Sequence, residues 1–111
     1  MKLNDTIVAQ STPPGIGAIG IIRLSGKNSI KIVNTLFPSK DLSKVDSHTI
    51  HYGNIENKGL IIDEVLVSIF KEPNSYTKEN IVEISCHGAD FIIKKILSLT
   101  IMLGARVADK G

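Results

Sequence analysis

The sequence predicts an α+β fold in which two or three helices pack on a mixed, mostly antiparallel sheet. Segments with strand character outnumber helical ones, and the helices are not regularly interleaved with strands as in a parallel α/β fold. The chain has 111 residues, of which 42% are hydrophobic and 22% charged, the balance of an ordinary domain with a single core.

The first third of the chain predicts two strands and a helix. Residues 7–10 form a short strand candidate, and the prolines and glycines of 11–17 interrupt it. Residues 18–25 are rich in β-branched side chains and apolar on both faces, which indicates a buried strand. Over 28–37 apolar side chains recur at helical spacing, and Pro38 ends this predicted helix.

The middle of the chain predicts a polar loop at 38–47 followed by a hairpin. Residues 48–55 form a plausible strand, and 57–59 can turn the chain back. Residues 61–73 alternate in side-chain character with the period of a strand. We therefore expect these two strands to be neighbours.

The last third predicts a buried strand and a second helix. A loop at 73–80 leads into the apolar strand 81–86, which Gly88 breaks. Residues 90–103 place aliphatic side chains on one helical face, with an aspartate near the positive end and a glycine following as C-cap. Residues 106–109 can begin one more strand.

Charge and cysteine content limit the function classes. Thirteen basic and eleven acidic residues give a net charge of +2 without a basic cluster, so RNA binding by this chain alone is not indicated. Cys86 is the only cysteine, which excludes an internal disulfide and favours a reducing compartment. There is no signal segment at the start and no apolar run near the ~18 residues that a membrane span needs. The sequence therefore predicts a cytoplasmic protein without a membrane segment.

A glycine pattern follows the first strand. Gly15, Gly17 and Gly20 match the GxGxxG pattern of dinucleotide-binding folds, but that mechanism needs a helix to begin at the glycines. Strand-forming residues follow instead. We therefore favour a strand-to-strand loop that can touch a ligand through its backbone, with Gly17 as a candidate contact. The P-loop pattern GxxxxGK[ST] is absent from the sequence.

Two charged residues, Arg23 and Glu83, interrupt otherwise apolar strands. A charge at a core-facing strand position must be paired, because an isolated buried charge costs several kcal/mol. One interpretation is that the two residues pair with each other or face solvent. The other is that both line a polar cleft and hold a ligand, since a carboxylate suits an amidine-like edge and a guanidinium suits an anion or carbonyl.

Other candidate groups have simpler explanations. Cys86 and His87 are adjacent in a strand and point to opposite faces, so we favour a buried cysteine that acts as a small hydrophobe. His87 and Gly88 then shape the corner between strand and helix. Tyr76 stands in a polar loop that is either a solvated turn or a cover that stacks on a flat aromatic ligand.

Two blocks of sequence carry a family resemblance. Residues 5–26 (DTIVAQSTPPGIGAIGIIRLSG) and 72–90 (EPNSYTKENIVEISCHGAD) resemble the signature blocks of the N-terminal domain of tRNA-modification GTPases of the MnmE/TrmE type. The second block departs from the family, which usually has glycine, aspartate and glycine where Lys78, Asn80 and Ala89 stand. These changes affect the expected loop geometry more than the expected function.

The resemblance implies a fold similar to the tetrahydrofolate-binding domain of aminomethyltransferases. It also implies a homodimer that binds a one-carbon tetrahydrofolate, such as 5-formyl- or methylene-tetrahydrofolate. The folate-contacting arginine and glutamate of the family fall on Arg23 and Glu83, with Tyr76 and Gly17 as weaker candidates. A third family contact, a lysine, lies beyond residue 111.

For the complete protein, the resemblance implies a helical domain that carries an inserted G domain with GTP, magnesium and potassium. With a flavin-dependent partner protein, such a GTPase adds an aminomethyl-type group to the wobble uridine of tRNA. We therefore expect residues 1–111 to be an N-terminal folate-binding and dimerisation domain, cut off before the GTPase motifs and without catalytic residues of its own. The alternatives are a dimerisation scaffold without folate and a free-standing folate-dependent transferase.

Overall fold

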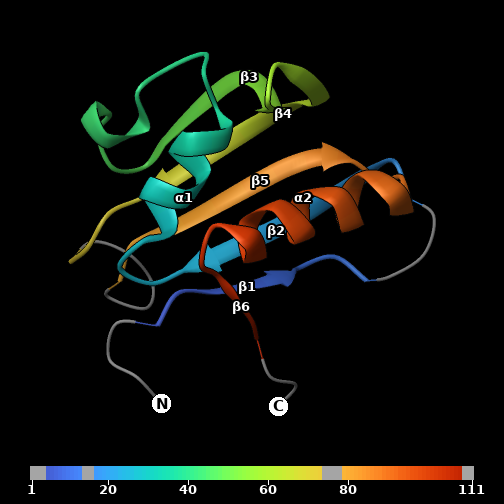
Figure 1. The fold of residues 1–111 in the computed structure, drawn as a ribbon. Helices are drawn as coiled ribbons and strands as arrows, with labels where there is room; N and C mark the ends of the chain where they lie inside the picture. Colours follow the sequence, from blue (N-terminus) through green and yellow to red (C-terminus); the bar gives the residue numbers. More distant parts are fainter. Residues whose placement is uncertain (1–4, 14–16, 74–78, 109–111) are drawn as a thin grey trace.

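A computed structural model describes residues 5–13, 17–73 and 79–108. They form two layers, a six-stranded sheet and two α-helices that both lie on one face of it (Figure 1). This is the α+β fold that the sequence predicts.

The sheet is mixed and mostly antiparallel. Every pair of neighbouring strands is antiparallel except the pair at one edge, β1 and β6, which is parallel. The strands lie in the order β3 (Thr49–Asn57), β4 (Leu60–Phe70), β5 (Ile81–His87), β2 (Ile19–Ser25), β1 (Ile7–Gln10) and β6 (Arg106–Val107). The central neighbours β5 and β2 are thus distant in sequence.

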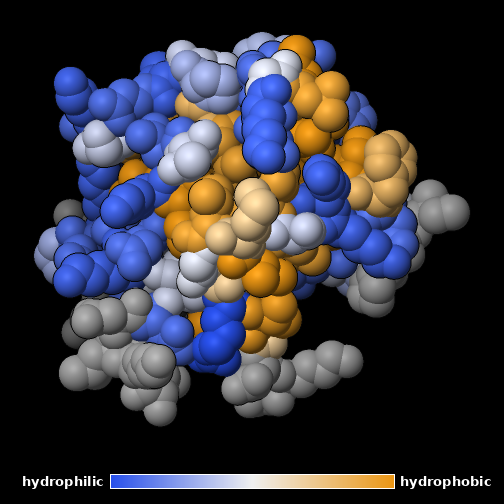
Figure 2. Space-filling model, viewed as in Figure 1, coloured by the Kyte–Doolittle hydropathy of each residue, from blue (hydrophilic) through white to orange (hydrophobic). Residues whose placement is uncertain are grey.

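Both helices are connections between strands that are not neighbours. Helix α1 (Ser29–Leu36) leads from β2 to the outer strand β3, and α2 (Asp90–Met102) leads from β5 to β6 (Figure 1). Figure 2 shows this side of the molecule, where apolar side chains spread over α2 and the middle of the face. Phe91 and Met102 of α2 are among the exposed apolar side chains.

The core lies between the sheet and the helices because strand side chains alternate between the two faces. On β2, Ile22 and Leu24 are fully buried under the helices, whereas Ile19 is 62% exposed on the other face. The helices thus cover one face only. We call the other face, which the described helices leave uncovered, the open face.

The loop predicted at 38–47 contains structure that its polar composition hides. A short 3-10 helix, η1 (Leu42–Lys44), places Leu42 in the core with no exposed surface. The Asn34 side chain accepts a hydrogen bond from the Leu42 backbone N–H at 2.8 Å, and Asp41 accepts one from Ser43. These backbone N–H groups bond to side chains and not to the backbone carbonyls of a regular helix. The residue pattern of 38–47 therefore predicts a loop and does not reveal the short helix.

Candidate functional site

The open face carries a row of side chains from five strands. Strand register places them side by side in the order Ile50, Ser68, Glu83, Arg23 and Ala9. The two charged residues stand near the centre of this row, which we call the ion-pair row. The register thus brings together two residues that are 60 positions apart in sequence.

Arg23 and Glu83 are paired with each other, as one of the two interpretations of the sequence predicts. The Nε and Nη2 atoms of Arg23 each lie 2.9 Å from Glu83 Oε2. Among the described residues, Glu83 Oε1 and Arg23 Nη1 have no hydrogen-bond partner. The side chains are 46% and 25% exposed, so the pair contributes only about 0–1 kcal/mol to stability.

A pocket of about 340 Å³ lies beside the ion-pair row. The next row on the open face contains Tyr52, Leu66 and Ser85, all of which line it. Pairing between β4 and β5 ends at Leu66 and Ser85, so the strands part at this point. Ile19 and His87, which pair across β2 and β5, form its far end. We call this hollow the open-face pocket.

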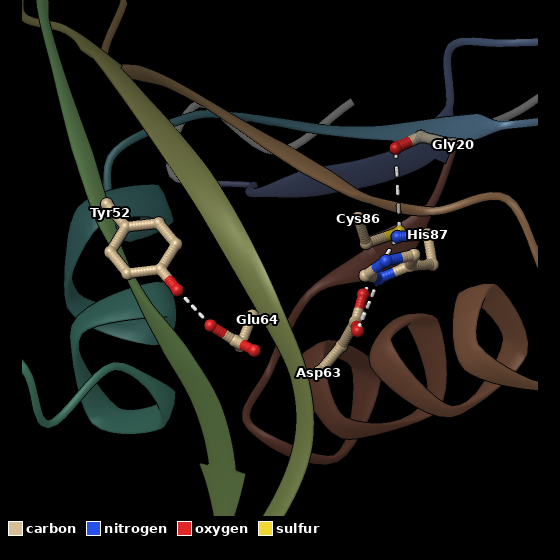
Figure 3. A network of polar contacts seen from close by, with 6 residues as sticks. All are labelled: Gly20, Tyr52, Asp63, Glu64, Cys86 and His87. Carbon is tan, nitrogen blue, oxygen red and sulfur yellow. Dashed lines mark hydrogen bonds and ion pairs between the residues drawn. The ribbon is translucent and has the colours of Figure 1, made fainter.

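His87 is held in place by a buried carboxylate. Asp63 is 8% exposed and accepts hydrogen bonds from the His87 backbone N–H at 2.8 Å and from its ring Nδ1 at 2.7 Å (Figure 3). An ionised carboxylate only accepts hydrogen bonds, so Nδ1 carries a proton. The imidazole side chain itself is 69% exposed, and Nε2 has no partner among the described residues.

A second polar contact forms the opposite wall. The Tyr52 hydroxyl donates to Glu64 Oε2, and both residues line the open-face pocket (Figure 3). This hydrogen bond, reinforced by the negative charge of Glu64, raises the pKa of Tyr52 above its ordinary value. Tyr52 is therefore a neutral aromatic surface near neutral pH.

The glycine candidate lies close to the same pocket. Gly17 precedes the pocket residue Ala18, and its carbonyl lies against Gly88 at the end of β5. Gly17 leads into strand β2, which contains Gly20, and not into a helix, which confirms that the GxGxxG pattern is no dinucleotide fingerprint here. The other weak candidate, Tyr76, lies outside the described residues.

Cys86 is buried, as predicted. It is 4% exposed, and its sulfur donates to the Gly20 carbonyl at 3.5 Å. Burial, together with the negative charge of Asp63, raises the pKa of this thiol to about 11. A thiol in that state is a poor nucleophile at neutral pH.

Sequence reasoning missed the open-face pocket. Tyr52 and Leu66 are ordinary strand residues, and Asp63 is not among the site residues that the sequence predicts. One signal was available: two acidic residues, Asp63 and Glu64, stand in a strand that is otherwise apolar except for Ser68. Both are hydrogen-bonded at the pocket.

In the parts of the chain that the structure describes, no helix is long and apolar enough to cross a membrane. The same residues contain no group of three or more histidine, cysteine, aspartate or glutamate side chains that could hold a metal ion. The chemistry that the open face does offer is a guanidinium, a carboxylate and an oriented imidazole next to apolar walls.

Comparison with known proteins gives consistent matches. The family model described as the GTP-binding protein TrmE N-terminus matches residues 6–111. The tRNA modification GTPase MnmE of Cytophaga hutchinsonii is 56% identical over 107 residues, which is 96% of this chain and 23% of that protein. The proteins of the same name from Flavobacterium johnsoniae and Thermoanaerobacter pseudethanolicus are 51% and 52% identical, over 96% of this chain and 24% of each relative. The chain thus spans about a quarter of the length of these curated relatives.

Proposed function

The chain belongs to the TrmE N-terminal family, and from this premise we propose that it is a domain that binds a one-carbon tetrahydrofolate on its open face. The observation that carries this proposal is the Arg23–Glu83 pair, which occupies an uncovered sheet face beside a pocket of ligand size. The ligand is 5-formyl- or methylene-tetrahydrofolate.

The two charged side chains have complementary roles. The free Oε1 of Glu83 accepts N–H groups from the aminopyrimidine edge of the pterin, in a charge-assisted hydrogen bond. The free Nη1 of Arg23 donates to the carbonyl, formyl or glutamate-tail oxygens of the folate. Because each residue also holds the other, both groups are oriented before the ligand arrives.

The role of the domain is binding and orientation, while the folate supplies the carbon. We propose that the parent protein is a cytoplasmic GTPase whose G domain, with GTP, magnesium and potassium, lies outside this chain. With a flavin-dependent partner it adds an aminomethyl-type group to the wobble uridine of tRNA. The names of the relatives, tRNA modification GTPase MnmE, support the GTPase and the tRNA-modification parts of this proposal.

We further propose that the domain forms a homodimer through the outer part of the open face. Strand β3 is an edge strand, and its Ile50 and Tyr52 are 66% and 68% exposed on that face. Exposed apolar side chains that cluster on one surface are typical of interfaces. Sedimentation equilibrium of the wild-type chain, Ile50→Lys and a helix-side control, Phe91→Lys, tests this. A dimer that only Ile50→Lys dissociates supports the assignment, and a wild-type monomer at all concentrations refutes it.

Calorimetric titration of the chain with 5-formyltetrahydrofolate tests folate binding. We expect saturable binding that Arg23→Ala abolishes. Arg106→Ala is a matched control, because Arg106 forms an ion pair with Asp5 at the sheet edge and is 44% exposed, close to the 46% of Arg23.

Each result of the titration decides between functions. Binding that Arg23→Ala loses and Arg106→Ala keeps supports the folate site. A folded wild-type chain that binds no folate refutes it and leaves the dimerisation scaffold as the better account. Equal losses in both arginine variants would show that charge alone, and not this site, attracts the ligand.

A further inference from the structure

An apolar patch lies on the helix side of the sheet, where α2 ends. Ile101 and Met102 in the last turn of α2 are 42% and 64% exposed, and Val107 of β6 is 56% exposed. Val107 pairs with the fully buried Val8, so both side chains lie on the face that carries the helices. Figure 2 shows apolar side chains that continue from α2 toward this edge of the sheet. We call Ile101, Met102 and Val107 the helix-side patch.

A hollow of about 170 Å³ adjoins the patch, between α1 and the end of α2. Leu103, the residue after Met102, lines it together with the buried Ile32. Benzene fills an apolar cavity of about 150 Å³, so this hollow has room for one leucine or phenylalanine side chain. Its remaining lining is polar and comes from the start and the outer side of α1, with Asn28, Lys31 and Thr35.

The composition of this surface indicates the chemistry of what covers it. The outer side of a surface helix is normally polar, but residues 99–102 of α2 contain no charged side chain. Lys31 at the hollow and Lys95 on the outer side of α2 are exposed and form no ion pair among the described residues. Apolar side chains bordered by unpaired positive charges suit a segment whose apolar residues are flanked by carboxylates.

The position of the patch favours a segment of the same polypeptide. The chain covers 23% and 24% of two relatives, and the family model describes an N-terminus, so about three quarters of such a protein follow the matched part. The described chain ends at Ala108, directly after the patch residue Val107. Whatever follows is therefore tethered at the patch, and a short tether raises its effective concentration to roughly the millimolar range.

The size and charge of the patch argue against a separate molecule. A stable complex between separate proteins buries roughly 1,000 Å² or more, which exceeds what three side chains and one hollow provide. A tethered segment needs much less area. A two-fold contact between copies brings the same surface of each together, so the lysines bordering the patch would repel one another.

We propose that the helix-side patch is the docking site of the segment that follows residue 111 in the parent protein. An apolar side chain of that segment fills the hollow, others cover Met102 and Val107, and its carboxylates face Lys31 and Lys95. The inference rests on the family assignment and is independent of folate binding on the open face.

Photo-crosslinking of the purified parent protein tests this docking. The photoreactive amino acid p-benzoylphenylalanine replaces Met102 in one variant and Val107 in a second, so the test does not depend on the folding of either alone. The matched control carries the same group at Leu60, which is 67% exposed on β4, near the opposite edge of the sheet. Mass spectrometry identifies the crosslinked peptides, and gel electrophoresis separates links within one polypeptide from links between two.

We expect the Met102 and Val107 probes to crosslink, within one polypeptide, to the segment after residue 111, at least about fivefold more than the Leu60 probe. Crosslinks between two copies would assign the patch to a second copy and overturn the proposal. Probes that crosslink no more than the Leu60 control overturn it as well, because the patch is then uncovered.

Charge reversal tests the acidic character of the segment. Lys31→Glu combined with Lys95→Glu should lower the yield from the Met102 probe at least about threefold. Lys58→Glu is the control, because Lys58 is an exposed lysine of the β3–β4 turn without an ion pair among the described residues. Equal yields in both variants would refute the charge complementarity on which the proposal rests.

Discussion

Replacing Gly88 by alanine should destabilise the fold and disturb the proposed ligand site together. A Cβ atom on Gly88 would overlap the carbonyl oxygen of Gly17 and lie 2.6 Å from its carbon and 3.1 Å from the Ile19 nitrogen. These are backbone atoms, which cannot move aside as the end of a flexible side chain can. The backbone N–H of Gly88, which donates to the Ala18 carbonyl at 3.1 Å, would be displaced as well.

The size of the effect follows from these two losses. Overpacking costs about 1–3 kcal/mol and a lost hydrogen bond about 1 kcal/mol, so Gly88→Ala should destabilise the domain by roughly 2–4 kcal/mol. For a chain of this size, that lowers the thermal midpoint by roughly 10 °C or more. Because Ala18 and Ile19 line the open-face pocket, folate affinity should also fall.

Urea and thermal unfolding of the variant, followed by circular dichroism, measure the loss of stability. Gly17→Ala is the matched control, since a Cβ atom there meets only the Ile19 carbonyl oxygen at 3.9 Å and should change stability by less than about 0.5 kcal/mol. Equal midpoints for wild type and Gly88→Ala would refute the close packing of the Gly17 loop against the end of β5.

Three further predictions concern single side chains. Glu83→Gln should weaken folate binding at least tenfold, or ~1.4 kcal/mol, with an unchanged thermal midpoint; equal affinity in calorimetry would exclude Glu83 as a ligand contact. Cys86, with a pKa of about 11, should react with iodoacetamide at neutral pH only after unfolding. Mass spectrometry detects the label, and rapid labelling of the folded chain would contradict the burial of Cys86. The pKa of Tyr52, raised by Glu64, should fall toward the ordinary value in Glu64→Gln. An ultraviolet pH titration in a Tyr76→Phe background, where Tyr52 is the only tyrosine, measures this pKa. An unchanged pKa would argue against the hydrogen bond between Tyr52 and Glu64.

Local sequence determined most of the secondary structure. The glycines and prolines of 11–17, the turn at 57–59 and Gly88 separate segments that have clear strand or helix character. The observed strands and helices begin and end within a few residues of the predicted positions. The exception is η1, where the Leu42 backbone N–H bonds to the Asn34 side chain eight positions earlier in the chain. Local periodicity gives no signal for such a contact.

The sequence alone also identified Arg23 and Glu83 as unusual, because a charge in an apolar strand needs an explanation wherever the strand lies. It left open whether they pair, since that depends on β2 and β5 being neighbours in register. The open-face pocket depends still more on tertiary structure: Tyr52, Leu66 and His87 come from three strands, and no local pattern places the three side chains around one pocket. The residue pattern along a strand determines which of its side chains share one face of the sheet. Hydrogen bonding between strands that are distant in sequence determines which side chains of neighbouring strands lie next to each other on that face. A binding site consists of such neighbours, so only the tertiary structure decides it.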